Sequence, residues 1–308
     1  MAYGTASSME RAERFTRSIP AMVRAERPSI SFEFFPPKDD AAEAQLWQAI
    51  RHLEKVAPSF VSVTYGAGGG TRDRTVRVTG RIAQETSLTA MAHLTCVGSP
   101  VTELRSVVGH YASVGIRNVL ALRGDPAGGL GTPWTTHPEG LDHADGLVAL
   151  VKGLGDFTVG VAAFPDGHPE SGDLGADVET LLRKERAGAE FAITQMVFDV
   201  DNYLRLRDAL ARRGSLLPVV PSIMPITNAR QVIRMAQLAG QPMPRAVTDR
   251  LDRHGEDTAA IRAEGIEIAT ESAQRLLGEG APGIHFITMN RSSAALEVHA
   301  NLGVPIAV

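Results

Sequence analysis

The sequence has a single cysteine, Cys96, so no disulfide can form within the chain. Such sparse use of cysteine favours a reducing, cytoplasmic setting. No run of residues approaches the ~20 apolar positions that a helix needs to cross a bilayer. The opening stretch MAYGTASSMERAERF also lacks the apolar segment of a signal peptide. We therefore expect no membrane association.

Excess charge and flexible linkers are also scarce. The net charge is −4 and there is no basic tract, which argues against nucleic acid as a partner. Hydrophobic residues make up 44% and charged residues 21% of the chain, as is typical of globular proteins. No low-complexity segment divides the sequence. We expect one domain over residues 26–308, preceded by a helical extension over residues 1–25.

Short apolar runs rich in β-branched residues recur along the chain and predict eight strands. The predicted strands are 29–35, 60–66, 90–96, 118–124, 159–165, 191–197, 217–223 and 283–289. Patterns with helical spacing lie between most of them, as at 39–56, 71–86, 100–115 and 177–189, and 227–280 predicts two or three helices. This alternation predicts a (β/α)8 barrel, with a doubly wound sheet as the alternative.

Active sites of such barrels lie at the carboxyl ends of the strands. Polar residues do gather at or just after these ends: Glu33, Thr64, Tyr65, His93, Thr95, Arg123, Asp125, His168, Gln195, Asn290 and Arg291. Alternation places Ser31 and Glu33 on one face of the first strand and its apolar residues on the other. We expect Glu33 to point into the barrel mouth with a raised pKa, suited to donating a proton. The alternative is a structural glutamate paired with Arg or Lys.

Two common ligand motifs are absent. The glycine-rich stretch YGAGGGTRDRT (65–75) does not have the GxGxxG spacing, and no Walker A pattern occurs. The candidate histidines His93 and His168 have no Cys, Asp or Glu at ligand spacing, so we expect no metal site.

Seven motifs resemble, in order and in approximate spacing, those of methylenetetrahydrofolate reductases. They are SFEFFPPK, FVSVTYGAGGGTRDRT, AHLTC, ALRGD, AAFPDGHPE, ITQMVFD and FITMNR, and the match runs from Ile30 to Leu302. The resemblance implies a TIM barrel that binds FAD non-covalently at the strand ends. It also implies a ping-pong reaction, in which NADH or NADPH reduces the flavin and 5,10-methylenetetrahydrofolate is then reduced to 5-methyltetrahydrofolate. This reaction belongs to one-carbon metabolism and methionine biosynthesis, and family members form dimers or tetramers.

The resemblance also assigns roles to individual residues. It implies that Glu33 is the general acid for folate N10 and that Asp125 lies between flavin and folate. The implied FAD contacts are Thr64, Tyr65, Gly66, Ala67, His93, Leu122, Arg123, Gly124, Asp125, Ala144, Phe164, His168, Asp177, Thr180, Arg183 and Lys184. The implied folate contacts are Glu33, Asp125, Gln195, Gln231 and Arg291.

Other interpretations of these residues remain open. Asp125 could be a turn or helix N-cap residue, His93 a core histidine, and Gln231 a surface residue. Residues 177–189 could form an ordinary solvated helix face. Departures from the family pattern at Phe164, Met235 and His143 bear on FAD binding and leave a flavin-independent folate barrel as an alternative, acting by direct hydride transfer or as a pterin methyltransferase. A non-catalytic ligand-binding barrel is a third hypothesis. Because the chain ends soon after the eighth strand, we expect no S-adenosylmethionine-sensing domain.

Overall fold

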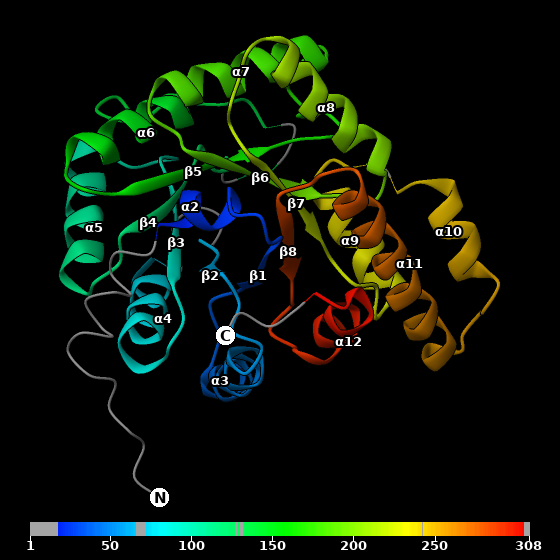
Figure 1. Ribbon diagram of the computed structural model, residues 1–308. Coiled ribbons are helices and arrows are strands. Elements are labelled where there is room, and N and C mark those ends of the chain that lie inside the picture. Colours follow the sequence, from blue (N-terminus) through cyan, green and yellow to red (C-terminus); the bar gives the residue numbers. More distant parts are fainter. Residues whose placement is uncertain (1–17, 66–71, 127, 130–131, 242, 305–308) are drawn as a thin grey trace, which may run out of the picture.

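Eight parallel strands close into a barrel (Figure 1). The computed structural model describes residues 18–65, 72–126, 128–129, 132–241 and 243–304. Neighbouring strands pair in chain order, and β8 pairs with β1 to complete the ring. The strands are β1 (Ser29–Phe34), β2 (Phe60–Val63), β3 (Ala90–Thr95), β4 (Asn118–Leu122), β5 (Thr158–Ala163), β6 (Phe191–Met196), β7 (Val219–Ile223) and β8 (Gly283–Ile287). The predicted (β/α)8 barrel is confirmed, and the closed ring excludes the doubly wound sheet, which has two open edges.

Helices surround the strands and connect them (Figure 1). They are α2 (Ile19–Val23), α3 (Asp40–Glu54), α4 (Arg72–Glu85), α5 (Val101–Ser113), α6 (Ala144–Gly153), α7 (Leu174–Arg186), α8 (Val200–Arg212), α9 (Ala229–Leu238), α10 (Arg245–Asp252), α11 (Thr258–Gly278) and α12 (Ser293–Leu302). The helices predicted at 39–56, 71–86 and 100–115 are present as α3, α4 and α5. The helix predicted at 177–189 is present as α7, which begins three residues earlier, and the interval 227–280 holds three helices.

The first strand shows how side-chain alternation divides the core. Phe32 and Phe34 are fully buried toward the helix ring, where Phe32 stacks on Phe286 with ring centroids 5.7 Å apart. Each such aromatic burial contributes roughly 1.5–3 kcal/mol to folding. Ser31 and Glu33 project to the other side, into the barrel, where both contact His285. Glu33 therefore lies on the predicted interior face of β1, but it is not among the residues that line the cavity at the strand ends.

The short helix α2 fills the amino-terminal end of the barrel. Ser18 caps the helix through its side chain, and Ile19 and Val23 are buried. They belong to a small apolar cluster with residues near the starts of the strands, namely Phe60, Met91, Leu120, Phe191, Ile193 and Val220. This end of the barrel is therefore filled by side chains. The helix lies within the extension predicted over 1–25, of which residues 1–17 fall outside the described part of the chain.

Candidate active site

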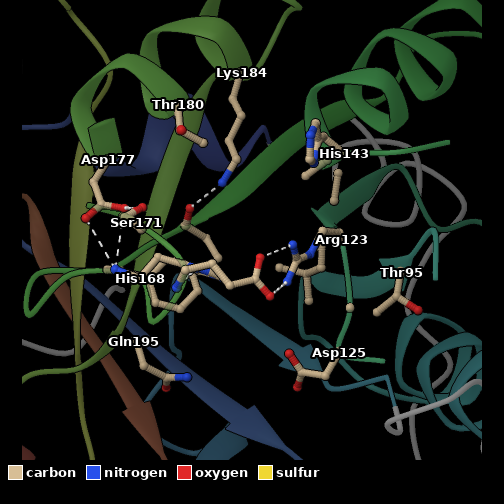
Figure 2. Close-up of a pocket in the computed structure, with 18 of the residues that line it drawn as sticks. Thr95, Arg123, Asp125, His143, His168, Ser171, Asp177, Thr180, Lys184 and Gln195 are labelled. Atoms are coloured by element: carbon tan, nitrogen blue, oxygen red, sulfur yellow. Dashed lines mark hydrogen bonds and ion pairs between the residues drawn. The ribbon is translucent and has the colours of Figure 1, made fainter. Parts of the chain in front are cut away.

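A cavity of about 470 Å³ lies at the carboxyl ends of the strands, between the loops that follow β4 and β5 and the helix α7 (Figure 2). Its volume falls within the range of ligand pockets, about 300–1,000 Å³. Most of the residues expected to contact FAD line it, as do two of those expected to contact folate, Asp125 and Gln195. These are Tyr65, Leu122, Arg123, Gly124, Asp125, Ala144, Phe164, His168, Asp177, Thr180, Arg183, Lys184 and Gln195.

Other predicted residues lie elsewhere. Gly66 and Ala67 fall outside the described residues, and Gln231 and Arg291 are exposed and do not line the cavity. Thr64 also does not line it; its backbone N–H bonds to the Phe34 carbonyl. The binding roles of these residues stay predictions.

Helix α7 presents a lysine to the cavity that is almost fully buried. The Lys184 ammonium donates a hydrogen bond to the Ala162 carbonyl at 2.9 Å (Figure 2). Among the described residues, no carboxylate forms an ion pair with it, although Asp145 and Asp177 attract it from a greater distance. Burial lowers the pKa of Lys184 to about 8, because an ammonium ion loses its hydration there. A buried cation without such an ion pair, facing a cavity, is suited to an anionic ligand such as a phosphate.

The same helix carries a buried carboxylate, Asp177. The Ser171 hydroxyl donates to it at 2.6 Å, and the His168 backbone N–H lies 3.3 and 3.4 Å from its two oxygens (Figure 2). The His168 ring lies edge-on to Phe164, with centroids 4.7 Å apart. Asp177 and Lys184 are buried, so residues 177–189 are not the ordinary solvated helix face of the alternative interpretation.

The turn after β4 places the Gly124 backbone and the Asp125 carboxylate at the wall of the cavity. Gly124 has φ +85°, and a Cβ atom there would lie 2.6 Å from Val97 Cγ1. Only glycine fits this position without strain. The turn directs Asp125 to the end of the cavity where Gln195 also lies, away from Lys184 (Figure 2). Asp125 does not cap a helix, since α6 begins at Ala144 with His143 as its N-cap.

Inside the barrel, Glu33 belongs to a polar cluster centred on His285. The His285 ring is fully buried, with Nε2 at 3.4 Å from Glu33 Oε2 and 3.4 Å from Ser62 Oγ. Its Nδ1 lies 2.7 Å from Ser31 Oγ, and its ring stacks on Phe60 with centroids 5.7 Å apart. These contacts fix the imidazole beside the carboxylate. The partners of Glu33 are therefore histidines, and not the Arg or Lys of the alternative interpretation.

The prediction of a raised pKa for Glu33 is wrong. Burial pushes the pKa of Glu33 upward, but the hydrogen bond from His285 and the attraction to His93 and His285 outweigh burial and lower it. Burial also lowers the pKa of His93 to about 4, so the His93 ring is neutral near pH 7. Because a neutral His93 ring attracts the carboxylate only weakly, the hydrogen bond from His285 is the main cause of the lowered pKa of Glu33. The carboxylate is therefore ionised at neutral pH.

His93 is a buried histidine with an incomplete set of contacts. Its Nε2 lies 3.6 Å from Glu33 Oε2 and has no hydrogen-bond partner within the described part of the chain. It does not line the cavity itself. The ring is therefore not the fully satisfied core histidine of the alternative interpretation.

Several residues of the site escaped the sequence reasoning. His285 follows Ile284 in β8, and the pairing of β8 with β1 places it opposite Ser31. The alternation that placed Glu33 inside the barrel, applied to β8, would have found it. Glu170 lines the cavity from the loop after β5, and Trp134 stacks on Arg123. Nothing in their local sequence indicated either contact.

The family model described as methylenetetrahydrofolate reductase matches residues 18–303. The chain belongs to this family. It is 39% identical to 5,10-methylenetetrahydrofolate reductase of Escherichia coli (strain K12) over 276 residues, which cover 90% of this chain and 91% of that protein. It is 34% identical over 289 residues to methylenetetrahydrofolate reductase (NADH) 1 of Zea mays, covering 90% of this chain and 49% of the maize protein.

A solved structure shares the fold of this methylenetetrahydrofolate reductase family member. An uncharacterized protein from Clostridium thermocellum that binds two copies of 5-methyl-5,6,7,8-tetrahydrofolic acid superposes with a TM-score of 0.64 at 12% identity. The match covers 92% of this chain and 97% of that one.

Within the described residues, no helix is long and apolar enough to cross a membrane.

Proposed function

We propose that this protein reduces 5,10-methylenetetrahydrofolate to 5-methyltetrahydrofolate with electrons from NADH or NADPH, using FAD held non-covalently in the cavity. Membership of the methylenetetrahydrofolate reductase family supports the reaction. The Clostridium neighbour, whose described ligand is 5-methyltetrahydrofolate, supports folate binding by a barrel of this shape. The observation that carries the cofactor is the buried Lys184, a cation at the wall of the cavity that forms no ion pair among the described residues.

The donor and acceptor groups around the cavity fit FAD. Lys184 and Arg183 would hold its phosphates, and Asp177 would accept hydrogen bonds from ribose hydroxyls. Asp125 and Gln195, at the far end of the cavity (Figure 2), would face the flavin ring and the pterin. The chemistry that FAD supplies when bound is storage of one hydride between oxidation of NAD(P)H and reduction of the folate.

Glu33 acts on the folate half of the reaction. The five-membered ring of the substrate opens when the bond between its methylene carbon and N10 breaks, and N10 then takes a proton from Glu33. The opened iminium accepts a hydride at the methylene carbon, which becomes the methyl group. Asp125 places a negative charge beside this cation and can hydrogen-bond the pterin.

The lowered pKa of Glu33 adds a requirement to this mechanism. A carboxylate that is ionised in the free protein must gain a proton before it can act as an acid. Substrate binding would bury the carboxylate further and remove water, and both effects raise its pKa. His285 holds the carboxylate in place through the Nε2 contact, and Ser31 orients the imidazole from the other nitrogen.

The visible absorption spectrum of the purified protein, with and without added FAD, tests the proposal. Flavin bands that bleach with NAD(P)H alone and return on addition of 5,10-methylenetetrahydrofolate support FAD and the ping-pong order. A colourless protein that takes up no FAD but still reduces the folate supports direct hydride transfer. A protein that oxidises no NAD(P)H with either the folate or menadione contradicts reductase activity altogether.

The role of Glu33 has its own test. Glu33→Gln should abolish folate reduction and leave flavin reduction by NAD(P)H within about threefold of wild type, because only the folate half needs this proton. The two half-reactions, measured by stopped flow on the same preparation, control for misfolding. If Glu33→Gln reduces the folate at the wild-type rate, the acid is another group.

A further inference from the structure

The guanidinium of Arg123 is held on two sides by Glu170 and Trp134, which have no role in the proposed mechanism. Its Nη1 and Nη2 atoms donate to the two carboxylate oxygens of Glu170 at 2.5 and 2.9 Å, and both bonds are drawn at Arg123 in Figure 2. The indole of Trp134 lies against the guanidinium, with Arg123 Cζ 4.5 Å from the ring centroid. A forked ion pair and a stacked aromatic ring together fix the plane of a guanidinium.

Both holding residues are themselves anchored. The Trp134 indole N–H donates to Asp142 at 2.8 Å and lies 3.2 Å from the Thr136 hydroxyl. The Glu170 backbone N–H donates to His168 Nδ1 at 3.1 Å. Arg123 is thus tied to the loop after β4 through Trp134 and to the loop after β5 through Glu170. Residues of both loops line the cavity.

The ion pair also changes what Arg123 can offer to a ligand. The Arg123 side chain is 15% exposed and that of Glu170 is 44% exposed, so the guanidinium is the more enclosed partner. Glu170 balances its charge but occupies only two of its five N–H groups. Within the described part of the chain the other three N–H groups make no hydrogen bond, and they lie in a fixed plane with little net charge. Such a group suits the carbonyl oxygens of a flat neutral ring, whereas an unpaired cation such as Lys184 suits a phosphate.

We infer that Glu170 and Trp134 are positioning residues for Arg123, which they hold as a neutralised, planar donor for the ring of the cofactor. The inference rests on the proposed function and extends it. Phosphate recognition then falls to the end of the cavity formed by Lys184 and Arg183. Loss of Glu170 should weaken binding of the ring and spare binding of the phosphates.

Two fragments of the cofactor separate these effects. Riboflavin carries the ring without phosphate, and ADP carries phosphates without the flavin ring. The chain has two tryptophans, so Trp47→Phe leaves Trp134 as the sole indole reporter beside Arg123. Calorimetric titration checks the affinities obtained from its fluorescence. The control is Glu179→Gln, which removes a comparably exposed carboxylate of α7 that pairs with Arg213 and does not line the cavity.

In the Trp47→Phe protein, the further change Glu170→Gln should weaken riboflavin binding about tenfold, the equivalent of one charge-assisted hydrogen bond. ADP affinity should stay within about twofold or increase, because Arg123 is no longer neutralised. Glu179→Gln should change neither affinity. By calorimetry, Trp134→Leu should weaken riboflavin binding and Trp134→Phe should restore it, since phenylalanine retains an aromatic face.

Three results would count against this reasoning, each in a different way. Unchanged riboflavin affinity in Glu170→Gln overturns the positioning role. Equal weakening of riboflavin and ADP also overturns it, because a general loss of structure would then explain both. If the wild-type protein binds neither FAD nor its fragments, the proposed function itself fails.

Discussion

Replacing Lys184 with methionine should stabilise the flavin-free protein while removing FAD binding. The lysine is almost fully buried, and burial lowers its pKa from 10.5 to about 8 in spite of the attraction to Asp145 and Asp177. At about 1.36 kcal/mol per unit, this depression corresponds to a cost of about 3 kcal/mol to the folded state near pH 7. Methionine fills a similar volume without charge, but leaves the Ala162 carbonyl without its hydrogen bond, which costs about 1 kcal/mol. The expected net gain is about 2 kcal/mol.

The pH dependence of this gain has a definite sign. Below pH 8 the lysine is protonated in both folded and unfolded chains, so the full cost is present. Between pH 8 and 10.5 the folded chain releases the proton first, and the stability of the wild type rises with pH. Above pH 10.5 the lysine is neutral in both states. The advantage of Lys184→Met should therefore be largest at pH 7 and disappear above pH 10.5.

Urea unfolding of the flavin-free proteins at pH 7 and at pH 10.5 measures this difference. Thermal unfolding at pH 7 should show a rise of about 3 °C, because the unfolding entropy of a chain of 308 residues is large. The exposed Lys55→Met is the control for removing a positive charge elsewhere and should shift neither midpoint. A Lys184→Met protein less stable than wild type at pH 7 would refute the reasoning, since the lysine would then be well compensated. Added FAD should stabilise the wild type and not the variant.

Three further outcomes follow from the geometry. His285→Leu should raise the pKa of Glu33, because leucine donates no hydrogen bond and burial would then act without that opposing interaction. An infrared band of protonated carboxyl that persists to higher pH in the variant than in the wild type would reveal the shift, and bands that titrate together would show that this bond does not set the pKa. Between pH 6.5 and 4 the wild type should lose about 3 kcal/mol of unfolding free energy through His93, because the unfolded histidine binds a proton in this window and the folded one does not. His93→Gln should remove this part of the loss. If urea unfolding at acid pH shows that the variant loses as much unfolding free energy as the wild type, His93 is not the source of the loss. Gly124→Ala should lower the free energy of urea unfolding by roughly 1–3 kcal/mol and weaken FAD binding, because φ at this position is +85° and the new Cβ would meet Val97. If neither the unfolding free energy nor the FAD affinity changes, the turn relaxes without strain.

Most of the fold was predictable because it depends on local periodicity. Apolar runs and helical spacing gave all eight strands, with the predicted end of the seventh strand at Ile223 as observed and the other seven ends one to three residues late. Whether eight strands form a ring or an open sheet depends on pairing between the first and last strands, 253 residues apart at Ser31 and Ile284. Periodicity carries no information about that pairing.

The site was predictable only in part. Residues after β4 and on α7 were expected to be together and do share a cavity. The resemblance to a known family carried that expectation, since Asp177, Arg183 and Lys184 taken alone are typical of a solvated helix. Alternation placed Glu33 inside the barrel, but the direction of its pKa shift was wrong. Burial alone would have raised this pKa, and the residue that lowers it, His285, lies 252 positions away in the chain.

The sequence by itself determined which residues form strands and helices, which face of each strand is apolar, and which polar side chains lie near the strand ends. These properties depend on residue type and on spacing over a few positions. The tertiary structure decided the closure of the barrel, the ionisation of Glu33, the lowered pKa of Lys184 and the fixed plane of Arg123. Each of these depends on which distant side chain lies within a few ångströms, because electrostatic and hydrogen-bond energies fall steeply with distance and change with burial.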